Sequence, residues 1–132
     1  MEPRITIITL GVRDFERSLQ FYRDGLRLPV GDRYPDAVFF RLTGITLGLY
    51  PRALLAKDAN VSAEGHGFEA IALAHNVRTR AEVERVLAEA EAAGGTVVQP
   101  PRVADWGGYS GYFADPDGHL WEVACTPAGS IE

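Results

Sequence analysis

The chain has 132 residues, a formal net charge of −5 and a sequence pI near 5.2. This length fits one domain, and an acidic chain without a basic cluster is a poor candidate for nucleic-acid binding. Cys125 is the only cysteine, so no disulfide can form within the chain. The N-terminus MEPRITIITL lacks a long apolar signal segment, and no apolar run reaches the roughly 20 residues of a membrane helix. We therefore expect a cytoplasmic protein without membrane or nucleic-acid partners.

The first half of the chain predicts a strand, a helix and three short strands. Residues 5–12 are rich in β-branched side chains, which favour a strand. Asp14 is a candidate N-cap for a helix with an apolar stripe at helical spacing, and Gly25 is its expected stop. A tight hairpin at Thr43-Gly44 joins the last two of the strands that follow. These strands are expected at Leu28–Val30, Val38–Leu42 and Ile45–Tyr50.

The second half repeats this order. Phe68–Ala74 predicts a strand, and Thr79 with Glu82 forms a capping box, in which each side chain accepts from the other's backbone N–H. The helix that follows should end at Gly94-Gly95. Its apolar stripe is Val83, Val86, Leu87 and Ala90, and the strands after it are Thr96–Gln99, Tyr109–Ala114 and His119–Cys125.

The repeat predicts an α+β fold of two βαβββ modules within one domain spanning residues 1–132. Module one covers about residues 4–52, a linker about 53–66, and module two about 67–126. A helical turn is expected at Leu54–Ala59 within the linker. Each helix can cover one face of its sheet, so we expect the other faces to curl into a cup for a small molecule.

Two sequence stretches within this doubled pattern resemble a known family. LGVRDFERSLQFY at 10–22 and GYFADPDGHLWE at 111–122 are similar to segments of the vicinal oxygen chelate proteins, the glyoxalase/bleomycin-resistance/dioxygenase superfamily. The resemblance implies the two-module cup and a small-molecule ligand. It also implies a homodimer, because relatives commonly complete the cup across two chains. It does not imply one reaction, because this fold hosts several.

The resemblance also implies where metal ligands would lie. The enzymatic members take His, Glu or Gln ligands from up to four strand positions, and these fall here on Ile7, Gly48, Glu69 and Glu122. Two carboxylates form a poor site for zinc or catalytic iron but could hold Mg²⁺ or Mn²⁺ loosely. We therefore expect no cofactor, with a weakly bound divalent metal at Glu69 and Glu122 as the open alternative. His66, His75 and His119 are interpreted as solvated or hydrogen-bonding histidines.

Glu122 is the carboxylate on which most of the functional interpretation depends. A type I turn at DPDG with a left-handed Gly118 would form a three-residue loop, which places Asp115 opposite His119 and Tyr112 opposite Glu122. By alternation Glu122 lies on the face of Leu120 and Ala124, and Trp121 on the face expected beneath the helices. Glu122 is therefore predicted to line the cup. The alternative is that it faces bulk water on a plain outer sheet.

Glu122 is the candidate general base and Tyr112 the candidate donor to developing negative charge. Ser110 and Tyr112 match positions that contact the substrate in related thiol transferases. Trp106 in a Gly-rich loop is either a stacking lid or ordinary packing. The candidate substrate-binding residues are Ile7, Thr9, Tyr50, Glu69, Trp106 and Ser110.

Three functions stay open on the sequence. The first is an enzyme, of a lyase, isomerase or transferase type, that acts on a small oxygenated or electrophilic molecule. The second is a metal-free protein that sequesters a hydrophobic or cationic drug. The third is a structural homologue without chemistry. Because Ile7 and Gly48 supply no ligands, glyoxalase I and extradiol dioxygenase activities are disfavoured.

Overall fold

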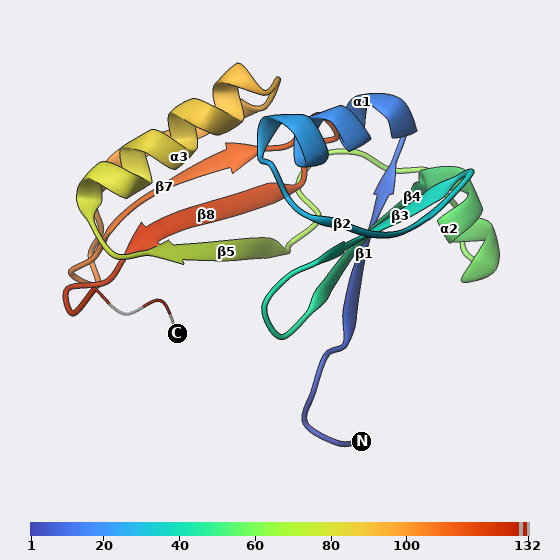
Figure 1. The fold of residues 1–132 in the computed structure, drawn as a ribbon, viewed down its shortest axis with the longest axis horizontal. Coiled ribbons are helices and arrows are strands. Elements are labelled where there is room, and N and C mark those ends of the chain that lie inside the picture. Colours follow the sequence, from blue (N-terminus) through green and yellow to red (C-terminus); the bar gives the residue numbers. More distant parts are fainter. Residues whose placement is uncertain (130, 132) are drawn as a thin grey trace. The chain divides into compact units, whose positions relative to one another are not determined.

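The computed structural model describes residues 1–129 and 131, which form two compact units that divide between His66 and Gly67 (Figure 1). Each unit holds one four-stranded mixed sheet, in which the first strand pairs in parallel with the last. The predicted α+β fold of two βαβββ modules is therefore confirmed. Among the described residues, no helix is long and apolar enough to cross a membrane.

The first unit orders its sheet as β1-β4-β3-β2. Its helices are α1 and the π-helix η1, which follow each other directly, and a short α2 after the last strand. The linker therefore begins with a helix where only a helical turn was expected. The strands are β1 (Ile7–Val12), β2 (Val30–Tyr34), β3 (Ala37–Arg41) and β4 (Thr46–Pro51), and the helices are α1 (Phe15–Leu19), η1 (Gln20–Gly25) and α2 (Arg52–Asp58).

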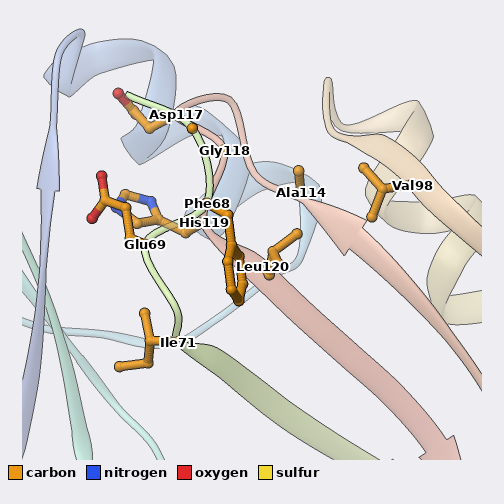
Figure 2. Close-up of a pocket in the computed structure, with 10 residues that line it drawn as sticks. Phe68, Glu69, Ile71, Val98, Ala114, Asp117, Gly118, His119 and Leu120 are labelled. Atoms are coloured by element: carbon orange, nitrogen blue, oxygen red, sulfur yellow. The ribbon is translucent and has the colours of Figure 1, made fainter. Parts of the chain in front are cut away.

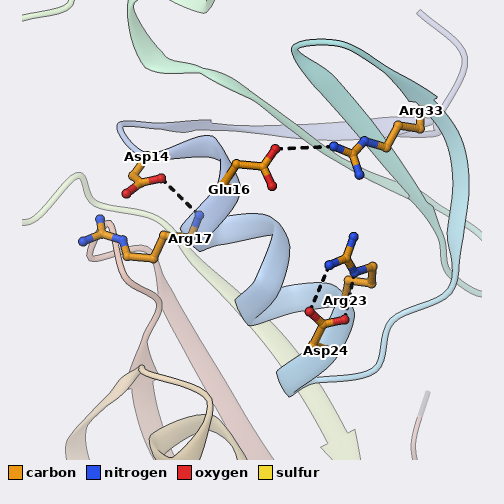
Figure 3. Close-up of polar contacts among 6 residues, drawn as sticks. All are labelled: Asp14, Glu16, Arg17, Arg23, Asp24 and Arg33. Atoms are coloured by element: carbon orange, nitrogen blue, oxygen red, sulfur yellow. Dashed lines mark hydrogen bonds and ion pairs between the residues drawn. The ribbon is translucent and has the colours of Figure 1, made fainter.

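The N-terminal end of α1 is capped as the sequence predicts. The Asp14 carboxylate accepts a hydrogen bond from the backbone N–H of Arg17 at 3.1 Å (Figure 3). The helix then widens into η1, where the N–H of Leu26 donates to the carbonyl of Phe21, five residues earlier, at 2.9 Å. It ends at Gly25, as expected, but the left-handed residue is Arg27, with φ of 60°.

Two ion pairs lie on the surface around this helix. Arg23 Nε is 2.8 Å from Asp24 Oδ1, and Arg33 Nη2 is 3.5 Å from Glu16 Oε1 (Figure 3). All four side chains are substantially exposed, and pairs of this kind contribute little to stability. The stability of this unit comes instead from its apolar core. Its larger buried apolar side chains are Leu10, Val12, Leu19, Phe21, Tyr22, Val38, Phe40, Leu47 and Leu49.

The second unit orders its sheet as β5-β8-β7-β6, and α3 lies across one face of it (Figure 1). The predicted capping box is present: Thr79 Oγ1 accepts from the N–H of Glu82 at 3.2 Å, and Glu82 Oε2 accepts from the N–H of Thr79 at 2.9 Å. The elements are β5 (Ala72–Val77), α3 (Arg80–Ala92), β6 (Thr96–Val103), β7 (Tyr109–Ala114) and β8 (Leu120–Cys125).

The strand expected at Phe68–Ala74 starts later, at Ala72. Ala70 has φ of 59°, a left-handed conformation that cannot continue an extended strand. The observed pairing decides which side chains share a face of the sheet. Leu73 pairs with Trp121 and lies on its face, and Ala74 pairs with Glu122 on the opposite face. Most other strands lie within one or two residues of their expected bounds, but β2 begins where Leu28–Val30 was expected to end, and β6 continues past Gln99 with irregular register.

Gly111 lets α3 approach β7 closely. A Cβ atom at Gly111 would lie 2.6 Å from Leu87 Cδ1 and 2.8 Å from the Gln99 carbonyl oxygen, so no side chain fits there. Val123 lies opposite Gly111 and is fully buried on the same face. Cys125 is also buried, with its Sγ donating to the Arg78 carbonyl at 3.2 Å. The face of the second sheet that carries Gly111 is therefore the one beneath α3.

Candidate functional site

Tyr112 and Glu122 form a hydrogen-bonded pair on the face of the second sheet that points away from α3. They are directly opposite in the β7–β8 ladder, as the turn geometry predicts. The Tyr112 hydroxyl donates to Glu122 Oε2 at 3.1 Å, and both side chains are half-buried. Val123 points toward α3, so the alternation of the strand puts Glu122 on the opposite face.

The environment keeps Tyr112 protonated. Burial raises the pKa of Tyr112 above 10.0, and the hydrogen bond and negative charge of Glu122 raise it further, while the positive charge of Arg102 opposes them in part. At neutral pH the site thus offers a phenol that can donate beside a carboxyl group that can accept. That combination suits proton abstraction together with stabilisation of a developing oxyanion.

The neighbours of Tyr112 and Glu122 on this face are buried small residues on one side and a pocket on the other. Ala74 of β5 lies beside Glu122 and brings no functional group. In one direction along β7 and β8, the next opposite pair on the same face is Ser110 and Ala124, and both are buried. In the other direction, the next pair on this face is Ala114 and Leu120, and both line a pocket.

This pocket has a volume of about 360 Å³ and lies beside the DPDG turn (Figure 2). Its walls are mostly apolar, and its polar groups are two carboxylates and one imidazole. A concave apolar site with a few convergent polar groups is typical of small-molecule binding. The lining residues are Gly67, Phe68, Glu69, Ile71, Val98, Ala114, Asp117, Gly118, His119 and Leu120.

The DPDG turn has the predicted geometry. Gly118 has φ of 91°, and its N–H donates to the Asp115 carbonyl at 2.9 Å. The N–H of Asp115 donates to the His119 carbonyl at 2.9 Å, so these two residues face each other across a three-residue loop. Only a residue that tolerates a left-handed backbone fits at Gly118 without strain.

The Asp115 carboxylate organises this turn and fixes the His119 ring. Its Oδ1 accepts from the N–H groups of Asp117 at 3.0 Å and His119 at 2.8 Å. Its Oδ2 lies 2.7 Å from His119 Nδ1. The Asp115 side chain is fully buried and that of His119 is 17% exposed. This contact favours a proton on Nδ1, which leaves Nε2 as the ring nitrogen that can meet a ligand.

The charge around His119 predicts a pH-dependent stability. Burial alone would lower the pKa of His119, but the hydrogen bond and charge of Asp115, with the charges of Asp117 and Glu69, outweigh it and raise the pKa above 6.5. A raised folded-state pKa stabilises the fold fully below the unfolded-state value, and this contribution is lost as the pH rises through the folded-state pKa. We expect the urea midpoint to fall over that range.

The His119→Gln variant should lose this dependence, because glutamine does not titrate. His75→Gln is the matched control, since His75 is exposed on β5 outside the pocket. Urea midpoints of the three proteins at a series of pH values between about 5 and 9 measure the effect around the usual histidine pKa. A midpoint of the His119→Gln variant that falls as steeply as that of the unmodified protein would contradict the assignment.

The sequence profile of the Glyoxalase/Bleomycin resistance protein/Dioxygenase superfamily matches residues 4–123. The chain belongs to this superfamily. The match spans both sheets and includes the DPDG turn with Glu122. The resemblance carried by the two sequence stretches is therefore confirmed at the level of the family.

Several solved structures share the fold of this chain. A glyoxalase-related enzyme from Fulvimarina pelagi is 35% identical, with a TM-score of 0.89 and coverage of 98% of this chain and 97% of that one. A lactoylglutathione lyase from Agrobacterium tumefaciens is 25% identical, with a TM-score of 0.74 and complete coverage of both chains. A hypothetical protein from S. aureus is 27% identical, with a TM-score of 0.82 and coverage of 95% and 94%. Comparison with curated proteins gives no match.

The positions at which the resemblance implies metal ligands carry two carboxylates, Glu69 and Glu122, and no imidazole or thiolate. Ile7 and Gly48 lie in the first unit and offer no ligand atom, and the Phe39 ring would lie 3.0 Å from a Cβ at Gly48. In the second unit Glu122 projects from β8, whereas Glu69 precedes β5. No group of three or more His, Cys, Asp or Glu side chains in the described part of the chain could hold a metal ion.

The candidate substrate-binding residues of the first unit lie on one face of its sheet. Ile7 and Thr9 in β1 pair with Thr46 and Gly48 in β4, and Tyr50 follows at the same alternation. Ile7 and Thr9 are exposed, and Tyr50 is half-buried. This face is the one opposite the buried Leu47 and Leu49, and α2 lies against one end of it, where a Cβ at Gly11 would lie 3.3 Å from Leu55 Cδ2.

The remaining candidates lie in three places in the second unit. Ser110 is buried one opposite pair from Tyr112 and Glu122, and Glu69 lines the pocket. Trp106 lies in the loop before β7, with its indole over Gly108, where a Cβ would overlap the ring. The ring is therefore packed on the loop backbone on one side, and the residue is 53% exposed.

His119 is a hydrogen-bonding histidine, as the sequence predicts. Sequence reasoning did not place it in a pocket, although the predicted turn already set Asp115 opposite it, and it did not identify the pocket's apolar walls. A carboxylate opposite a histidine across a tight loop is a signal that could have been used. No sequence signal marked the wall residues, because they come from separate segments: Phe68, Ile71, Val98 and Leu120.

Proposed function

We propose that this superfamily member is an enzyme that acts on a small oxygenated or electrophilic molecule at the Tyr112–Glu122 pair. The hydrogen bond between the Tyr112 hydroxyl and Glu122 Oε2 carries the proposal, because it sets a donor and an acceptor side by side. Glu122 removes a proton from the bound molecule, and Tyr112 turns its hydroxyl to the oxygen on which negative charge develops. The description of the Fulvimarina pelagi relative as a glyoxalase-related enzyme supports an enzymatic function.

The proposed chemistry uses no tightly held transition metal. Its support is the donor set, in which the superfamily's positions supply the carboxylates Glu69 and Glu122 and no imidazole. A weakly held Mg²⁺ or Mn²⁺ is compatible with two carboxylates and water. No step of the proposal depends on such an ion.

Metal removal provides the test of this proposal. The protein is purified without a chelator or affinity tag and screened by thermal shift and product analysis against α-dicarbonyls, epoxides and small drugs. Turnover of any substrate found is expected to survive dialysis against EDTA, and elemental analysis is expected to show no stoichiometric zinc or iron. Loss of turnover on dialysis, with recovery on adding zinc or iron alone, would contradict the proposal.

A metal-free binding protein is the second candidate. The acidic side chains of Glu69 and Asp117 beside apolar pocket walls favour it, since such a site suits an apolar cation. The same screen separates the two functions. A compound that raises the melting temperature and is recovered unchanged after prolonged incubation supports binding alone, and a product supports the enzyme.

We include a homodimer in the proposal. Its support is the pair of edge strands in each sheet, β1 and β2 in the first unit and β5 and β6 in the second. Edge strands expose backbone groups that another chain can cover.

A further inference from the structure

The pocket and the Tyr112–Glu122 pair are adjacent on one face of the second sheet. Ala114 and Leu120 are opposite each other and line the pocket, and Tyr112 and Glu122 are the next opposite pair on that face. Two residues along a strand span about 7 Å. A small molecule with one end in the pocket therefore reaches the reacting pair with its other end.

The apolar walls of the pocket are unusually exposed. Phe68 is 77%, Ile71 63% and Val98 50% exposed. These side chains come from the segment before β5 and from β6, and they meet Leu120 of β8 around the same space (Figure 2). Large apolar side chains that gather on a concave surface mark a place where an apolar group binds.

The polar groups of the pocket accept hydrogen bonds more readily than they attract anions. Asp115 engages Nδ1 of His119, and His119 lines the pocket, so Nε2 is the ring nitrogen left for a ligand. Glu69 and Asp117 add carboxylates, and the lining contains neither arginine nor lysine. The carboxylates repel an anion, whereas a hydroxyl or amino group can donate to them and, at a pH where the His119 ring is neutral, also to its Nε2.

We propose that this pocket is the recognition subsite for one end of the substrate, and that it takes a ring-sized apolar group bearing a hydroxyl or amino donor while rejecting carboxylates. This inference rests on the proposed function, because it identifies the class of substrate presented to Tyr112 and Glu122. His119 and Glu69 are the residues that select the donor. Phe68, Ile71, Val98 and Leu120 hold the apolar body.

The test uses three probes of one size on the full chain: benzyl alcohol, benzylamine and benzoate. Methyl NMR of the isotope-labelled protein reports binding at Ile71, Val98 and Leu120. Benzyl alcohol and benzylamine are expected to shift these methyl signals to saturation, and benzoate is expected to bind at least about tenfold more weakly. Equal binding of benzoate, or shifts confined to methyl groups outside the pocket, would overturn the proposal.

Two variants and two controls locate the selectivity. Glu69→Gln should weaken the binding of benzylamine more than that of benzyl alcohol, because it removes charge but keeps an acceptor. His119→Gln should weaken the binding of both probes. The exposed Glu64 and His75 lie outside the pocket, so Glu64→Gln and His75→Gln should bind all probes as the unmodified protein does. If His119→Gln fails to fold, Glu69→Gln decides: unchanged selectivity between the alcohol and the amine overturns the proposal.

Different experimental outcomes contradict the proposed function and the proposed subsite. Tyr112→Phe and Glu122→Gln change the reacting pair outside the pocket, so both should keep probe binding. Retained probe binding together with full turnover by Glu122→Gln would refute the proposed function and leave the subsite in place. Loss of the expected probe selectivity together with a large loss of turnover in Glu122→Gln would refute the subsite and leave the function in place.

Discussion

Glu122→Gln should lower turnover of the substrate by about two to four orders of magnitude, the usual contribution of a general base. Glutamine has nearly the same shape and can still accept the hydrogen bond that Tyr112 donates to Oε2 at 3.1 Å. It cannot take a proton from a substrate at neutral pH. The fold should therefore be retained, as judged by the urea midpoint, while kcat falls.

A second tyrosine–glutamate pair provides a matched control. The Tyr109 hydroxyl donates to Glu84 Oε1 at 2.8 Å, and neither residue lines the pocket. Glu84→Gln makes the same chemical change in the same kind of contact, and turnover should stay unchanged. If both variants turn over the substrate at the rate of the unmodified protein, Glu122 is a bystander and the water-facing interpretation of its strand is correct.

Phe113→Ala is expected to destabilise the fold by about 3–5 kcal/mol, the usual cost of truncating a buried Phe. Phe113 is 2% exposed in β7, and its ring is stacked parallel to Trp121, with centroids 6.0 Å apart. The truncation removes apolar contacts and leaves a cavity, and the close packing of α3 on Gly111 limits how far the unit can collapse into it.

Phe68→Ala is the control for this stability change. It removes the same atoms from a residue that is 77% exposed, so its free energy of unfolding should change by about 0.5 kcal/mol or less. Urea unfolding followed by circular dichroism measures both variants. If Phe113→Ala lowers the free energy of unfolding no more than Phe68→Ala does, Phe113 is not part of the core.

The local features of the fold could be predicted because neighbouring residues decide them. The Thr79–Glu82 capping box, the Asp14 cap and the Gly118 turn each depend on side chains within a few positions. The same holds for Tyr112 opposite Glu122, because the length of a hairpin loop fixes the register of its strands. The reacting pair of the candidate site was therefore predictable from FADPDGHLWEV alone.

The residue at which β5 begins could not be predicted from the sequence, because the tertiary structure decides it. FEAIALA has the composition of a strand throughout, yet Ala70 takes a left-handed conformation and pairing begins at Ala72. A strand's register against a parallel neighbour is set by packing along its whole length, not by a turn, so sequence alternation could not fix it. As a result Ala74, not Glu69, lies beside Glu122.

The pocket also depended on the tertiary structure. It brings together the segment before β5, the Val98 region of β6 and the turn before β8. These segments are distant in the chain, and their side chains form no periodic pattern that would single them out. The sequence by itself determined the two βαβββ modules, their caps and the Tyr112–Glu122 pair, because short-range hydrogen bonding and alternation specify them. Only packing between distant segments turned His119 and Glu69 toward one space, because side-chain convergence is a property of the folded chain.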